Sequence, residues 1–187
     1  MSDNLREQLI LLPDYLRGHL VLTVAALAMG IAISVPLGIL VTRVARLKRP
    51  VLLVVSVIQT IPSLAILAII VALLAGRIGF LPAFLALTLY SMLPIVRNTV
   101  TGLEQVPDNV IEAARGIGMT EGQILIKVRL PLALPVLIAG IRTATVWTVG
   151  LATLSTLVGA TSLGNYIFSG IQTRNLTAVT VGSISSA

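Results

Sequence analysis

The chain has no cysteine among its 187 residues, which excludes disulfides and thiolate metal sites. Histidine occurs once, as His19, so a histidine-based metal site is not expected either. Charged residues make up 11% of the chain, against about 25% in an average soluble domain. Aromatic residues make up 4%, and no GxxxxGK[ST] phosphate-binding loop is present. The sequence therefore predicts no metal site, no bound cofactor and no ATP hydrolysis in this chain itself.

Apolar side chains are abundant instead: they make up 56% of the residues, and the mean hydropathy is +1.02. Four apolar stretches have roughly the 17–25 residues that cross a bilayer as a helix. They cover residues 19–42, 51–75, 80–96 and 132–160. A fifth runs from Leu176 to Ala187 and spans only about 18 Å as a helix, against about 30 Å of hydrocarbon. We expect an all-α membrane protein with one domain over residues 1–187 and about five helices, of which the last is truncated.

Lysine and arginine are unevenly distributed between the two sides of these expected spans. Residues 1–18 indicate a short amphipathic helix at the membrane surface rather than a cleavable signal. One side carries eight basic residues: Arg43, Arg46, Lys48, Arg49, Arg97, Arg115, Lys127 and Arg129. The other side carries four: Arg6, Arg17, Arg77 and Arg174. Because basic residues favour the cytoplasmic side, the sequence predicts an extracytoplasmic N-terminus and explains the net charge of +6 without nucleic acid.

Proline lies inside each full apolar stretch, at Pro36, Pro62, Pro94 and Pro135. Proline removes a helical hydrogen bond and bends the helix. The bends are either ordinary kinks of membrane helices or hinges of a bundle that opens and closes. Gly30, Ser34 and Gly38 form a stripe of small residues that permits close helix packing.

Polar residues within the stretches are candidates for a pore or for helix pairing. Gln59, Asn98 and Thr145 are expected to form hydrogen bonds between helices more often than to contact a solute. Arg142 lies at membrane depth, where a charge faces the bundle interior or a pore unless it reaches the interface. Trp147 stands alone in the fourth stretch and is interpreted as packing.

A polar segment, EAARGIGMTEGQILIKVRLP, interrupts the apolar stretches at residues 112–131. Pro107 and Asp108 suit a helix start, and glycines at 116 and 118 suit its end. Thr120 and Gln123 have the spacing of a capping box for a second helix. Residues 107–130 are therefore predicted to form two short helices joined by a tight turn. On this pattern alone, the hairpin either contacts a partner or merely joins two spans.

The same segment resembles the EAA motif in the permease subunits of ATP-driven (ABC) importers. The matching residues are Glu112, Ala113, Ala114, Gly118, Val128, Leu130 and Pro131, with valine at 128 where isoleucine is usual. Four further stretches, 59–67, 89–103, 140–160 and 162–170, are similar to permeases for glycine betaine, choline and related osmoprotectants. The resemblance implies the type I importer (MetI-like) bundle, with the seven motif residues contacting an ATPase subunit through coupling helices.

The resemblance also implies a function and a set of partners. The expected function is import of a compatible solute such as glycine betaine, choline, carnitine or proline betaine by alternating access in the inner membrane. The expected partners are a separate ATPase, an extracytoplasmic solute-binding protein that recognises the solute, a second permease copy or homologue, and lipid. The alternatives are a permease of the same architecture for methionine or another amino acid, and a membrane scaffold protein.

Overall fold

The computed structural model describes residues 3–186, and it describes the surroundings of side chains from Ile10 to Ser186. No strand occurs among residues 3–186, so the all-α prediction is confirmed. The helices are α1 (Asp3–Arg43), α2 (Ala45–Thr60), α3 (Ser63–Leu73), α4 (Phe80–Glu104), α5 (Asp108–Gly116), α6 (Glu121–Ile124), α7 (Leu130–Ala152), α8 (Gly164–Gln172) and α9 (Leu176–Ser186). A π-helical turn, Leu125–Arg129, joins α6 to α7, and a 3-10 turn, Leu154–Val158, follows α7.

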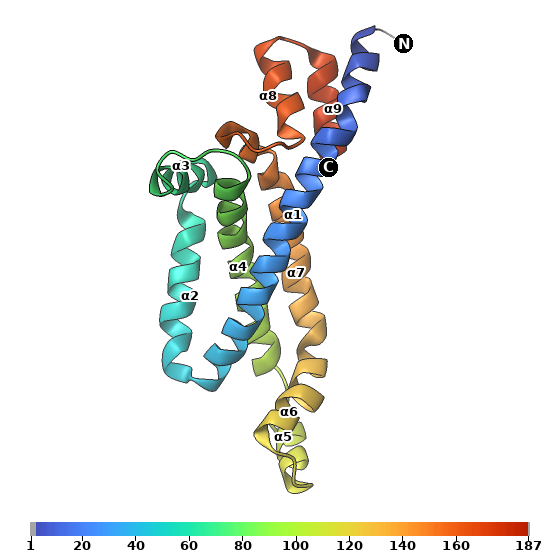
Figure 1. Ribbon diagram of the computed structural model, residues 1–187. Coiled ribbons are helices and arrows are strands. Elements are labelled where there is room, and N and C mark those ends of the chain that lie inside the picture. Colours follow the sequence, from blue (N-terminus) through green and yellow to red (C-terminus); the bar gives the residue numbers. More distant parts are fainter. Residues whose placement is uncertain (1–2, 187) are drawn as a thin grey trace.

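Within the described residues, three helices are long and apolar enough to cross a membrane: Ile10–Arg43, Phe80–Glu104 and Glu121–Ala152. The pair α2 and α3 forms a fourth candidate span, which is bent by 101° between the two helices. Helix α9 is a shorter apolar helix. Each of the five apolar stretches thus has a helical counterpart, as Figure 1 shows.

Several expected boundaries are wrong. Helix α1 is continuous from Asp3, so residues 3–18 belong to the same helix as the first apolar stretch and do not form a separate one; residues 1 and 2 lie outside the described part. Helix α1 continues through Gly18, and this glycine packs directly on the main chain of Thr161. The third helix runs on to Glu104 instead of ending at residue 96, which places Arg97 inside α4. The fourth stretch ends as an α-helix at Ala152, and α8 was not expected.

Helix α4 is the centre of the bundle and packs along α1 on one side and α7 on another. Small residues bring these helices close together. A Cβ on Gly30 would lie 2.0 Å from Ser91 Oγ, and one on Gly38 would lie 2.6 Å from Thr99 Cγ2. Ser34 between them is fully buried. The interpretation of this stripe as a close-packing surface is therefore confirmed.

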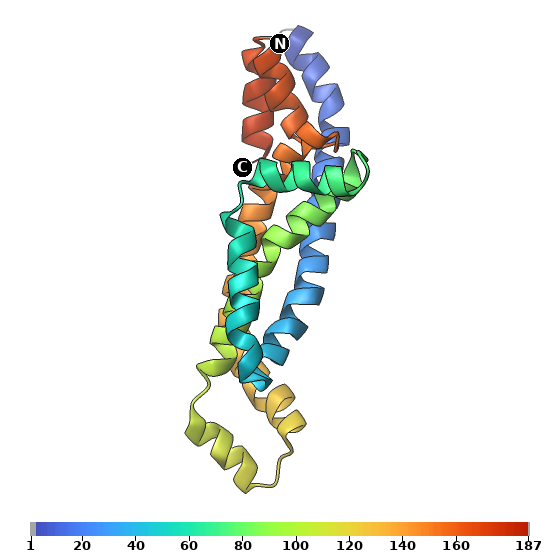
Figure 2. The same cartoon turned by 90° about the vertical axis from the view of Figure 1, so that its left-hand side faces the viewer.

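The two ends of the bundle carry different elements. Helices α5 and α6 project beyond the spans at one end, beside the α1–α2 link (Figure 1). Helix α3, the α8–α9 hairpin and the beginning of α1 lie at the opposite end, and a quarter turn of the molecule shows the same separation (Figure 2). The two basic links predicted to share one side thus lie at the same end.

Candidate functional site

The projecting hairpin is built as the sequence predicts. Pro107 precedes α5, Asp108 is in its first turn, and the left-handed Gly118 (φ 84°) reverses the chain after it. The capping box is present: Thr120 Oγ1 accepts from the Gln123 main-chain N–H, and Gln123 Oε1 accepts from the Thr120 N–H at 2.9 Å. Both helices of the hairpin therefore begin and end at positions that their own sequence specifies.

A small apolar core holds the hairpin together and decides which motif residues face outward. Its buried members are Val106, Ile111, Ala114 and Ile124, with Met119 and Val128 packed against them. Ala114 therefore supports the hairpin from inside. Glu112, Ala113 and Gly118 are exposed, and so is Pro131 at the start of α7, whereas Leu130 is half-buried.

Ile117 is a candidate that the sequence analysis did not single out. Helical spacing alone would place it on one face with Ile111 and Ala114, but its side chain is 80% exposed at the tip of the hairpin. Helix α5 ends at Gly116 and the chain then turns at Gly118, so Ile117 leaves the buried face. The sequence does contain a signal for this exposure, because Ile117 is an apolar residue in a polar turn between Arg115 and Gly118. The tip thus exposes one large apolar side chain directly after the helix that carries the exposed Glu112 and Ala113.

An ion pair crosses the turn between the two helices of the hairpin. Arg115 Nε donates to Glu121 Oε1 at 2.7 Å, and both side chains are more than half exposed. The hydrogen bond from Arg115 to the Glu121 carboxylate raises the pKa of the Arg115 guanidinium above its usual value. Exposed pairs of this kind contribute little to stability, so this pair adds at most a small restraint on the turn.

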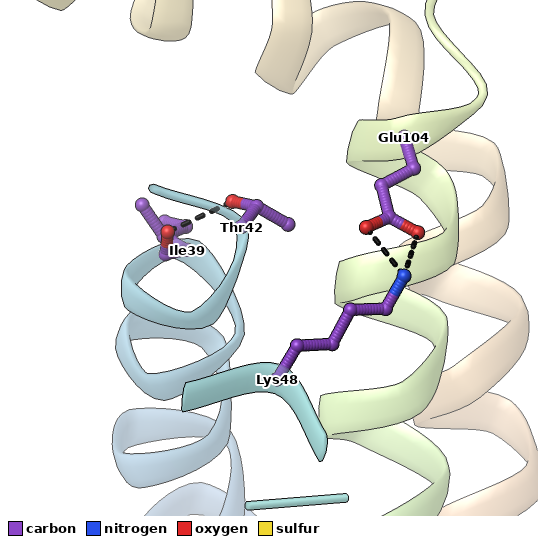
Figure 3. Close-up of polar contacts among 4 residues, drawn as sticks. All are labelled: Ile39, Thr42, Lys48 and Glu104. Carbon is purple, nitrogen blue, oxygen red and sulfur yellow. Dashed lines mark hydrogen bonds and ion pairs between the residues drawn. The ribbon is translucent and has the colours of Figure 1, made fainter. Parts of the chain in front are cut away.

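A second ion pair joins the α1–α2 link to the end of α4. Lys48 Nζ lies 2.7 Å from both carboxylate oxygens of Glu104, as Figure 3 shows. Glu104 is the last residue of α4, and the chain continues from it into α5. Lys48 lies in the first turns of α2. The pair therefore connects the root of the hairpin to the helix that leads to the bend at Pro62.

Pro62 breaks the second apolar stretch instead of merely bending it. Ile61 has the extended backbone that a following proline favours (φ −73°, ψ 129°), so α2 ends there and α3 leaves at 101°. Tyr90 of α4 packs in one apolar cluster with Ile66, Leu67 and Ile70 of α3, and it forms two hydrogen bonds with the end of α2. Gln59 Nε2 donates to the Tyr90 main-chain oxygen at 3.0 Å, and the Tyr90 hydroxyl donates to the Ile61 carbonyl.

Pro94 explains why the Tyr90 carbonyl is free to accept this bond. A proline has no N–H, so Pro94 cannot supply the helical bond to the carbonyl four residues before it. The Gln59 amide replaces that bond from another helix. The structure thus brings Gln59, Pro62 and Pro94 together through Tyr90, which the sequence analysis did not single out.

A cavity of about 420 Å³ opens at this break. It lies between the ends of α2 and α3 on one side and α7 on the other. Its lining residues are Gln59, Thr60, Ile61, Pro62, Ser63, Tyr90, Val146, Trp147, Gly150 and Leu151. Trp147 is 49% exposed, so its interpretation as a packing residue is wrong: it forms a wall of the cavity opposite the break.

The other predicted pore residues do not line this cavity. The Asn98 amide donates to the Pro94 carbonyl, and the Thr145 hydroxyl donates to the Ile141 carbonyl, each within its own helix. Arg142 is exposed on α7, one turn before Val146. It therefore does not face the interior of this chain's own bundle.

The chain matches the family described as "Binding-protein-dependent transport system inner membrane component" over residues 34–187. It is 45% identical to the choline transport system permease protein OpuBB of Bacillus subtilis over 154 residues, which are 82% of this chain and 70% of that protein. It is 44% identical to the carnitine transport permease protein OpuCB of Listeria monocytogenes over the same shares. It is 42% identical to the osmoprotectant import permease protein OsmW of Salmonella typhimurium over 89% of this chain and 79% of that protein.

Among solved structures, an inward-facing conformation of the MetNI methionine ABC transporter contains a chain with a TM-score of 0.86 and 28% sequence identity. The similarity covers 100% of this chain and 91% of that one. The arrangement of helices is thus that of a permease with the MetI-type fold. The family match covers most of the chain, and relatives above 40% identity align over most of their length. This chain therefore belongs to the inner membrane components of binding-protein-dependent transport systems.

Proposed function

We propose that the chain is the permease subunit of an ATP-driven importer for an osmoprotectant, such as choline, carnitine or glycine betaine. The relatives named for these solutes support the solute class. ATP hydrolysis belongs to a separate ATPase subunit, and solute recognition outside the membrane belongs to a binding protein. A second permease subunit completes the solute path.

The observation that carries this proposal is the exposed tip of the α5 hairpin. Its core residues are buried inside the hairpin, whereas Glu112, Ala113, Gly118 and the apolar side chain of Ile117 are exposed. A large apolar side chain that a structure leaves exposed at such a projection is typical of a protein contact. We assign the ATPase contact to this tip, with Ala114 and Val128 supporting it from inside.

The test is the change Ile117→Ser, with Leu176→Ser as a matched control. Both side chains are 80% exposed, but Leu176 begins α9, away from the hairpin. Loss of one buried isoleucine should weaken association with the ATPase by at least about tenfold. We expect Ile117→Ser to lose the ATPase during co-purification and to lose ATP-driven uptake, while the control retains the ATPase. Normal co-purification and uptake of Ile117→Ser would remove this assignment.

The cavity at the α2–α3 break is the proposed contact of this chain with the moving solute. Broken membrane helices place main-chain polar groups at membrane depth where they line a path. The cavity combines such a break with Gln59 and with the ring of Trp147. Aromatic rings attract quaternary ammonium groups, which choline and betaines carry. Arg142 and Val146 on the same exposed side of α7 face the second permease subunit in this arrangement.

The orientation is proposed from the positive-inside rule, with the hairpin in the cytoplasm and the N-terminus outside. Because the chain has no cysteine, single cysteines at Lys127 and Arg77 report each side separately. A membrane-impermeant thiol reagent should label position 77 but not position 127 in intact cells. The opposite labelling would reverse the orientation.

Methionine is the second candidate solute, because the fold agrees with that of a methionine transporter at a TM-score of 0.86. The two solutes differ in charge distribution, since methionine carries a protonated amine and betaines a quaternary ammonium. Uptake of labelled choline into proteoliposomes that contain the ATPase and the binding protein separates them. Inhibition by methionine but not by glycine betaine would favour the second candidate.

A further inference from the structure

A second polar cavity, of about 350 Å³, lies at the end of the bundle that carries the hairpin. Its lining residues are Thr42 and Arg43 at the end of α1, Glu121 in α6, and Leu125 and Arg129 in the π-helical turn. Residues 43 and 129 are far apart in the sequence, and the fold brings their guanidinium groups to one cavity. None of these residues lines the cavity at the α2–α3 break.

The two arginines have no ion-pair partner among the described residues. Glu121 is the one carboxylate in the lining: its Oε1 accepts from Arg115, and its charge also attracts Arg43 and Arg129 without a direct ion pair to either. The Nε of Arg129 is buried and donates to no acceptor in the described part of the chain. The Thr42 hydroxyl already donates to the Ile39 carbonyl at 2.8 Å, as Figure 3 shows. The cavity thus carries two guanidinium groups against one carboxylate, which already accepts from Arg115, and it contains a buried N–H donor that no acceptor satisfies.

A buried donor without an acceptor and an excess of guanidinium groups over carboxylates together favour an anionic ligand. The guanidinium fork matches phosphate oxygens in geometry, and arginine is a preferred residue for binding phosphate. A cavity of about 350 Å³ has room for roughly ten waters at ~30 Å³ each, which accommodates a phosphate group with its substituents.

The position of the cavity indicates where such a phosphate comes from. Arg43 is the last residue of one candidate span, and Arg129 lies in the first turns of another, between its start at Glu121 and the beginning of α7 at Leu130. The ends of membrane helices lie at the level of the lipid headgroups, and basic pockets between helices at this level bind anionic headgroups. Leu125 and the adjoining exposed Ile126 provide apolar surface beside the charged groups. The tip that we assign to the ATPase, around Ile117, is a separate part of the hairpin.

We propose that Arg43 and Arg129 form a binding site for the phosphate of an anionic phospholipid, which bridges the end of α1 to the beginning of α7. The bound phosphate accepts from both guanidinium groups, including the buried Nε of Arg129. Because the hairpin enters α7 through the same π-helical turn, an occupied site fixes the root of the hairpin against α1.

The experiment measures retention of phosphatidylglycerol by the purified full chain, using native mass spectrometry, with phosphatidylcholine as the neutral comparison. The variants are Arg43→Gln, Arg129→Gln and the double change. The controls are Arg46→Gln and Arg49→Gln, which remove the same charge from positions in the same link that do not line the cavity. Each of the first two changes should weaken phosphatidylglycerol binding about fivefold, and the double change about 25-fold. The two controls should change it less than about twofold.

Two further measurements identify the ligand and test whether the glutamine variants lose binding only because they are unstable. The pair Arg43→Lys with Arg129→Lys keeps the charge, so it should retain part of the binding even if the glutamine variants are unstable. Inorganic phosphate at millimolar concentration should displace the lipid; phosphate binding without lipid binding would show a free-anion site and exclude the lipid. Equal retention of phosphatidylglycerol by the wild type and the double glutamine variant would overturn the proposal. Loss of ATPase co-purification in that variant, with lipid retention unchanged, would assign the cavity to the ATPase interface instead.

Discussion

Gly140 and Gly150 lie in the same helix, α7, but only one of them tolerates a side chain. A Cβ on Gly140 would lie 2.5 Å from Asn98 Cβ and 2.7 Å from the Pro94 carbonyl oxygen, whereas ordinary contacts begin at 3.4 Å. A Cβ on Gly150 would meet no atom within 4 Å. The neighbours of Gly140 belong to α4, and one of them is main chain, so α7 would have to move away from α4.

The expected magnitudes follow from two opposing effects. Replacing a helical glycine with alanine stabilises the helix by about 0.8–1 kcal/mol, and this gain applies to both positions. Overpacking of a close contact costs about 1–3 kcal/mol, and this cost applies to Gly140 alone. The two variants should therefore differ in the free energy of unfolding by about 1–3 kcal/mol, because the helix propensity cancels in the comparison.

The measurement is reversible unfolding in mixed micelles, with the two alanine variants and the wild type compared at the same lipid and detergent composition. Gly150→Ala should be at least as stable as the wild type, and Gly140→Ala should be the less stable variant. If both alanine variants gain stability equally, the close approach of α4 and α7 at Pro94 is wrong. Gly140→Ser serves as a second variant, which should be at least as destabilised as Gly140→Ala.

Three other predictions follow from single contacts. Gln59→Leu leaves the Tyr90 carbonyl without its donor beside the proline kink, so it should lower stability by about 1–2 kcal/mol in the same unfolding assay; wild-type stability would contradict this. Lys48→Glu places a second acid beside Glu104 and should uncouple ATP hydrolysis from uptake in proteoliposomes. Adding Glu104→Lys restores an ion pair with the charges exchanged, so the double variant should regain coupling; a double variant no better than the single one would refute the role of the pair. Gly118→Val forces a β-branched residue to a φ of 84°, which costs about 1–3 kcal/mol, so the ATPase should be lost on co-purification although the spans remain folded; unchanged co-purification would show that the turn is not needed.

The hairpin shows how much of a site a local sequence can specify. Its boundaries at Pro107, Gly118 and Thr120 were predictable, because caps and left-handed turns depend on residues within a few positions of each other. The outward direction of Ile117 was not predictable in the same way. It depends on where α5 stops being helical, and a single residue decides whether the side chain joins the hairpin core or leaves it.

The site at the α2–α3 break depended on contacts that the sequence does not record. Pro62 and Pro94 were recognised as interruptions of helices, but nothing in the sequence shows that they lie beside each other. Tyr90 connects them, with its carbonyl freed by Pro94 and its hydroxyl bonded to Ile61. Trp147 reaches the same cavity from α7. Because these two hydrogen bonds join residues more than 25 positions apart, local sequence patterns contain no signal for them.

The sequence by itself determined the class of protein, the number of apolar stretches and the position of the polar hairpin. These features follow from composition and short-range spacing, because a membrane span depends on length and hydropathy and a cap depends on neighbouring residues. The tertiary structure alone decided that the second stretch turns by 101°, that α1 is one helix from Asp3, and that Arg43 and Arg129 share a cavity. Those outcomes depend on packing between distant segments, where a proline, a glycine or a charge has its effect only through the neighbour that the fold supplies.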